Sequence, residues 1–154
     1  MMSSIRNSNA KYFLFGVLML IIIGLLLWKF VYISKLSNTE IDQLVMQATF
    51  GKDESSLGQL KKAANQGQID AKMAVGKSYL FHHQIASALP FLNDAAQQGN
   101  VEAQTLLGKL YFHGEAQVKK NNALALKYFT QAFQNKDPIA AYYLGLMYKN
   151  GYAT

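Results

Sequence analysis

A ladder of small and aromatic residues recurs three times in the chain and constrains its fold more than any other feature. Each copy has an alanine, a glycine five residues later and a tyrosine three residues after that. The copies start 32 and 37 residues apart and consist of Ala71, Gly76 and Tyr79; Ala103, Gly108 and Tyr111; and Ala140, Gly145 and Tyr148. Self-similarity at this period is typical of stacked helical hairpins. Such a stack builds an extended surface, so the pattern favours a binding protein over an enzyme.

Apolar residues recur at helical spacing from residue 40 onward. The first stripe consists of Ile41, Leu44, Val45 and Ala48, which fall on one face of a helix. Later stripes are separated by glycine-containing or polar turns, as at Gly67 and Gly99. We therefore predict an all-α domain over residues 40–154, an α-solenoid of about three and a half antiparallel helical hairpins.

Several residues have the properties of helix starts. Asp53 and Asn100 are side chains that cap helix N-termini well, and Asp137 precedes a proline that suits the first helical position. Pro90 would fit a helix that starts near Ser87, because a missing N–H costs little in the first turn.

The N-terminal region contains a long apolar stretch. Residues 12–28 carry no charge, and the apolar run resumes after Lys29 and continues to Ile33. A helix over residues 12–33 would be about 33 Å long, enough to cross a bilayer if Lys29 extends its ammonium to the interface. We predict a tail at 1–11, a transmembrane helix at 12–33 and a linker at 34–39. The alternative, a cleaved signal peptide, is disfavoured by the length of the run and by the lack of a small-x-small site after it.

Most of the net charge of +6 lies beside this apolar stretch. Arg6 and Lys11 precede it, whereas Lys29 and Lys35 interrupt or follow it, so the positive-inside rule is nearly balanced. The tail carries no acid, and we expect it to stay in the cytoplasm. Basic residues at this position fit contact with the anionic lipids of a bilayer.

The remaining region is nearly neutral. Residues 36–154 contain 11 Lys, 9 acidic residues and no Arg. Such a balance argues against a nucleic-acid partner, which requires a basic face that neutralises several phosphates. The chain has no cysteine, which excludes disulfides and thiolate metal sites.

Two segments resemble the Sel-one-like repeat, a relative of the tetratricopeptide repeat. Residues 103–114 (AQTLLGKLYFHG) and 140–151 (AAYYLGLMYKNG) both fit its pattern A-x-x-x-L-G-x-x-Y-x-x-G. Ala95 and Ala96 with Gly99 match the ending of its second helix. The resemblance covers about residues 54–151, and the first copy departs from it at Val75 and His82.

This resemblance implies a right-handed superhelix of antiparallel helix pairs that binds proteins. It also implies an adaptor in a bacterial envelope, secretion or signalling assembly. Together with the apolar stretch, it suggests a single-pass protein of the bacterial inner membrane with its C-terminal domain in the periplasm.

The polar residues give little support for chemistry. His82, His83 and His113 are expected to be solvated loop residues rather than metal ligands, because a zinc site needs convergent ligands. No motif places a nucleophile beside a base, and Asp94 and Glu102 are expected to be solvated near helix ends. We therefore predict no catalytic residues, no metal and no cofactor, and a protein that is not an enzyme. The mid-helix glycines of the ladder are expected to permit close helix packing.

The C-terminal helix is the best candidate for a binding site. It is apolar on nearly every face, and helical arrays normally end with a polar outer face. We expect its surface to be open because its pairing helix is missing; the alternative is that the sequence is a fragment. The candidate protein-binding residues are Tyr142, Tyr143, Met147 and Tyr148.

Three functions remain open at this point. We favour a membrane-anchored adaptor or scaffold that binds a protein, or a second copy of itself, through the C-terminal helix. One alternative is an inhibitory or toxin-neutralising protein that blocks a single target. Another is an envelope enzyme or a regulator of one.

Overall fold

A computed structural model describes residues 2–33, 35–115 and 117–152, and gives side chains for these except in 2–11 and 30–33. The described part contains eight helices: α1 (Met2–Ile33), α2 (Asn38–Phe50), α3 (Glu54–Asn65), α4 (Ile69–Phe81), α5 (Ile85–Gln97), α6 (Val101–His113), α7 (Asn122–Gln134) and α8 (Pro138–Lys149). The predicted all-α class is confirmed. The only β-bridge among these residues joins Glu115 and Val118.

The chain divides into two units, residues 1–36 and 37–154. The first unit consists of α1, whose segment Tyr12–Lys29 is long and apolar enough to cross a membrane. The helix begins before the predicted transmembrane segment and includes residues 2–11, which contain no glycine or proline to break it. Met1 of the predicted tail and Ser34 of the predicted linker lie outside the described residues.

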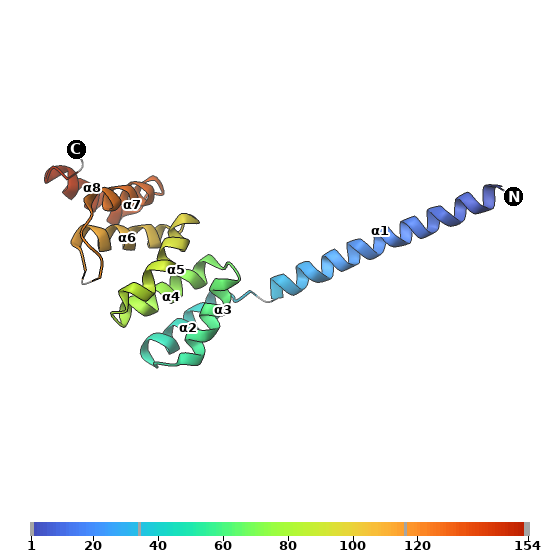
Figure 1. Cartoon of the computed structure of the whole chain (residues 1–154), viewed down its shortest axis with the longest axis horizontal. Coiled ribbons are helices and arrows are strands. Elements are labelled where there is room, and N and C mark those ends of the chain that lie inside the picture. The colour runs from blue at the N-terminus through green and yellow to red at the C-terminus, as the bar shows by residue number, and fades with distance from the viewer. Residues whose placement is uncertain (1, 34, 116, 153–154) are drawn as a thin grey trace. The chain divides into compact units, whose positions relative to one another are not determined.

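The second unit consists of α2 to α8, and each of these helices packs against the next (Figure 1). Two further contacts, α2 with α4 and α6 with α8, join the first helices of successive hairpins. The first helix of this unit starts inside the predicted linker because Ser37 and Glu40 form a reciprocal capping box. Ala116 and the last two residues of the predicted domain, 153 and 154, lie outside the described part.

The predicted caps at three helices are confirmed. The side chain of Asp53 accepts hydrogen bonds from two backbone N–H groups of α3. Asn100 accepts from Ala103 at the start of α6, and Asp137 accepts from Ala140 at the start of α8. Each side chain satisfies an N–H that has no partner within its own helix.

The prediction for α5 is wrong at its start. This helix begins at Ile85 rather than near Ser87, so Pro90 lies in its interior. The exposed N–H of Ala86 donates to Gln117 Oε1 at 3.0 Å, a cap from the loop between α6 and α7. Because Pro90 is exposed, the break in helical hydrogen bonding faces solvent.

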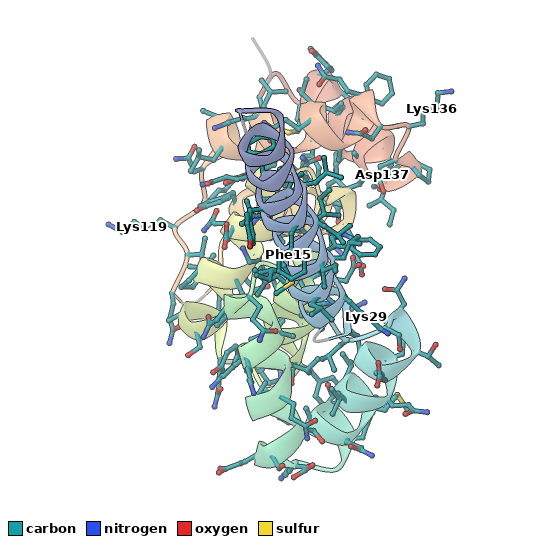
Figure 2. All side chains as sticks on the ribbon, turned by 90° about the vertical axis from the view of Figure 1, so that its right-hand side faces the viewer. Phe15, Lys29, Lys119, Lys136 and Asp137 are labelled. Carbon is teal, nitrogen blue, oxygen red and sulfur yellow. The ribbon has the colours of Figure 1, made fainter. Side chains whose placement is uncertain are left out.

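The turns that follow α3, α5 and α7 repeat one geometry. In each, a backbone N–H donates to the carbonyl of an alanine five residues earlier: Gln68 to Ala63, Asn100 to Ala95, and Asp137 to Ala132. The residue before the donor has a positive φ, in the left-handed region of backbone conformation. This residue is glycine in the first two turns and Lys136, with φ of 63°, in the third. Lys136 and Asp137 lie at the connection into α8 (Figure 2).

Two of the three ladder glycines permit the close packing that the sequence predicts. A Cβ on Gly76 would lie 2.6 Å from Leu92 of α5, and a Cβ on Gly108 would lie 2.6 Å from the Phe129 ring of α7. At Gly145 of α8, by contrast, nothing described lies within 4 Å of that position. The glycine of the third copy is therefore uncovered, whereas the glycines of the first two copies are covered by the helix that follows them.

Candidate functional site

The inner side of α8 is held in place by packing on α6 and α7. Ala140, Leu144 and Met147 belong to a buried cluster that also contains Phe112 and Phe129. This packing fixes the rotation of α8 about its axis and decides which residues remain outside.

The four candidate residues on α8 fall into different environments. Tyr142 and Tyr148 are 67% and 63% exposed. Tyr143 is half-buried: its ring stacks on Phe129 with centroids 4.8 Å apart, and its hydroxyl lies 3.2 Å from His113 Nε2. Met147 is 0% exposed and packs in the buried cluster beneath α8, so it offers no surface to a partner.

The ladder itself carries the signal that separates these residues. Met147 corresponds, 37 and 69 residues earlier, to Leu110 and Ser78, both of which are buried. A comparison of each α8 residue with the residue at the same position of the earlier copies would have assigned Met147 to the core. It would also have pointed to Gly145, which the sequence prediction did not include in the site.

One continuous strip of α8 is exposed. We call this strip the α8 outer face, and it consists of Ala141, Tyr142, Gly145, Tyr148 and Lys149. Residues at these intervals lie on the same side of a helix. Two exposed apolar side chains flank it in sequence, Ile139 at 49% and Tyr152 at 40% exposure. The result is a largely apolar surface with one positive charge.

The equivalent strips of α4 and α6 are not exposed. Tyr142 corresponds to Met73 and Thr105, which are each 4% exposed. Gly145 corresponds to Gly76 and Gly108, which are buried under α5 and α7 respectively. The α8 outer face therefore has the position of an internal packing surface but the exposure of an external one.

A groove of about 290 Å³ lies along α2, α4 and α6. Its walls include the carboxylates of Asp42 and Asp70, and the Lys77 ammonium lies 2.8 Å from Glu102 Oε1. Mixed charges and apolar side chains give this groove the character of a polar recognition surface. The lining residues do not include a histidine or a hydroxyl nucleophile that could form a catalytic pair.

The three histidines do not line one common groove. His82 Nε2 lies 3.3 Å from the carbonyl oxygen of Ala48, whereas His83 and His113 line a groove of about 320 Å³ that also contains Glu115. Among the residues that the structure describes, no group of three or more His, Cys, Asp or Glu is placed to hold a metal ion.

The two acids singled out in the sequence form ion pairs between helices. Asp94 on α5 lies 2.5 Å from Lys72 on α4, and Glu102 on α6 pairs with Lys77 on α4. The hydrogen bond from Lys72, followed by that from Gln98, lowers the pKa of Asp94 below its usual value. Both carboxylates remain about half exposed, which fits a role in joining helices rather than in catalysis.

No protein-family model matches the chain. None of the curated proteins with which it was compared matches it either.

Proposed function

We propose that the chain is a membrane-anchored adaptor whose residues 37–154 form a Sel-one-like solenoid of antiparallel helix pairs. The ladder, the repeated turns at the ends of α3, α5 and α7, and the sequential packing of α2 to α8 support this assignment. In this function the domain binds a protein partner and performs no chemistry.

The observation that carries the proposal is the α8 outer face. Its equivalents on α4 and α6 are buried or half-buried, with α5 covering Gly76 and α7 covering Gly108, whereas Tyr142 and Tyr148 project from α8 with most of their surface exposed. Exposed apolar patches mark interaction sites, and tyrosine is enriched among the residues that contribute most to binding energy. We assign the partner to this face.

The membrane anchor in this proposal is α1. The segment Tyr12–Lys29 meets the length and composition required to cross a bilayer. We propose the inner membrane of a bacterium, with the N-terminus in the cytoplasm and residues 37–154 in the periplasm. A reporter enzyme that is active in only one compartment, fused after residue 154, tests this orientation; activity on the cytoplasmic side would overturn it.

The binding function is tested by capture from detergent-solubilised membranes with the full chain as bait. Tyr142→Glu and Tyr148→Glu each place a charge on the α8 outer face at a well-exposed position, so the fold should survive, as circular dichroism can verify. The matched control is Met46→Glu, because Met46 is 59% exposed on α2 in the first hairpin. We expect specific partners to be lost with both tyrosine variants and retained with the control. Retention of every partner by all three variants would overturn the assignment.

A further inference from the structure

The hairpin of α4 and α5 shows how an equivalent face is covered. Leu92 of α5 occupies the space above Gly76, where it is 0% exposed. The residue before it, Phe91, places its ring 6.0 Å from that of Tyr79. Two small residues on the same side of α5, Ala88 and Ala95, are also fully buried.

The hairpin of α6 and α7 repeats this arrangement. Phe129 of α7 occupies the space above Gly108, and Tyr128 stacks on Tyr111 with ring centroids 5.9 Å apart and planes 5° apart. Ala125 and Ala132 are 0% exposed and hold the positions of the alanines in α5. Both covering helices thus carry the pattern Ala-x-x-(Phe/Tyr)-(Leu/Phe)-x-x-Ala.

Each element of that pattern has a receiving position on the α8 outer face. Gly145 leaves space for the large apolar residue, since nothing described lies within 4 Å of its Cβ position. Tyr148 corresponds to Tyr79 and Tyr111 and offers its exposed ring to an aromatic side chain. Tyr142 lies one turn before Gly145, at the position of Met73 on α4, which belongs to the same buried cluster as Ala88 and Ala95 of α5.

We infer that the α8 outer face receives an amphipathic helix of a partner protein that carries this same pattern. The inference rests on the proposed binding function and specifies its ligand: the partner's leucine or phenylalanine lies over Gly145, and its preceding aromatic residue lies against Tyr148. The partner helix takes the place relative to α8 that α5 takes on α4 and α7 takes on α6.

A second copy of the chain is a weaker candidate for this position. Only the two segments that form α5 and α7 contain the full pattern in the sequence, and both bury it within their own hairpins. A second copy could therefore present the pattern only by opening one of its hairpins. A separate protein with an exposed helix carries no such cost.

The test uses a labelled synthetic peptide of residues 121–136, which contains α7 and its cap, and the full chain in detergent micelles. The protein variants are Gly145→Leu, which fills the receiving space, and Gly58→Leu as a control. Gly58 is also an exposed helical glycine with nothing described within 4 Å, but it lies on α3. The control peptide carries Phe129→Asp. Binding is followed by fluorescence anisotropy, and a photo-crosslinker at the Phe129 position of the peptide identifies the contact.

We expect saturable binding to the wild type and to Gly58→Leu, at least tenfold weaker binding to Gly145→Leu, and crosslinks to residues 141–149. Equal binding of the two peptides, or equal binding to all three proteins, would overturn the inference. If the peptide fails while capture of a protein remains dependent on Tyr142, the inference is wrong and the proposed function stands. If instead Gly145→Leu dissociates a dimer seen by sedimentation and no peptide binds, the occupant is a second copy, and the inference is again wrong.

Discussion

Two ladder glycines, Gly108 and Gly145, should respond differently to alanine substitution. Gly108→Ala and Gly145→Ala both replace a helix-interior glycine, which by itself stabilises a helix by roughly 1 kcal/mol. The structure differs around the added methyl group. At Gly145 nothing described lies within 4 Å, so the stabilisation should be realised in full.

At Gly108 the added Cβ would lie 2.6 Å from two carbon atoms of the Phe129 ring. The optimal separation for such a contact is about 3.5–4.0 Å, so the ring would have to move by about 1 Å. Phe129 is 0% exposed and stacks on Tyr143 at 4.8 Å, which leaves it little room to do so. Overpacking of this kind costs about 1–3 kcal/mol.

The difference between the two variants isolates the steric cost, because the gain in helix propensity is common to both. We expect Gly145→Ala to be more stable than Gly108→Ala by about 1–3 kcal/mol, with the wild type between them or close to Gly108→Ala. Urea unfolding of the full chain in micelles, followed by circular dichroism, measures this difference from the midpoints if the slopes agree. Equal destabilisation by both substitutions would refute the assignment of Gly145 to an open face.

Three further predictions concern the connections between helices. Lys136→Gly should stabilise the domain by about 1 kcal/mol, as measured by its urea midpoint, because Lys136 adopts φ of 63° where glycine carries no steric penalty. Asp137→Ala should destabilise it by about 1 kcal/mol in the same assay, since the carboxylate accepts the hydrogen bond of Ala140 N–H at 2.6 Å. The pKa of Asp94 is lowered in the folded state mainly by its hydrogen bond from Lys72, so its contribution is present above the unfolded pKa and is lost as the pH falls through the folded value. Urea midpoints measured across the acidic range should therefore fall less steeply in Asp94→Asn than in the wild type; parallel curves would contradict this.

The sequence predicts those features that depend on nearby residues. Asp53, Asn100 and Asp137 cap their helices because each needs only a side-chain oxygen and an N–H within three residues. The close approaches at Gly76 and Gly108 were also predictable, since a repeated glycine in a helix interior has few other physical explanations.

Features that depend on distant residues were not predicted. The start of α5 at Ile85 involves Gln117, a residue 31 positions away from the Ala86 N–H that it caps. The division of α8 into buried and exposed sides could not come from its own composition, because it is apolar on nearly every face and gives no amphipathic contrast. The packing of Ala140, Leu144 and Met147 on α6 and α7 sets that division, and in the sequence it can be read only by comparing α8 with the earlier copies of the ladder.

The two ends of residues 37–154 differ in a way that bears on function. The exposed residues of α2 include Asp42, Gln43 and Gln47 beside the apolar Met46 and Phe50, so polar and apolar side chains are mixed on this helix. The α8 outer face has only Lys149 as a charged or amide side chain. If this face worked while exposed to solvent, polar residues could replace Tyr142 and Tyr148 at little cost to the core, because both side chains are mostly exposed whereas Met147 is buried. The apolar composition of this face is therefore better explained by a surface that is covered when the protein functions.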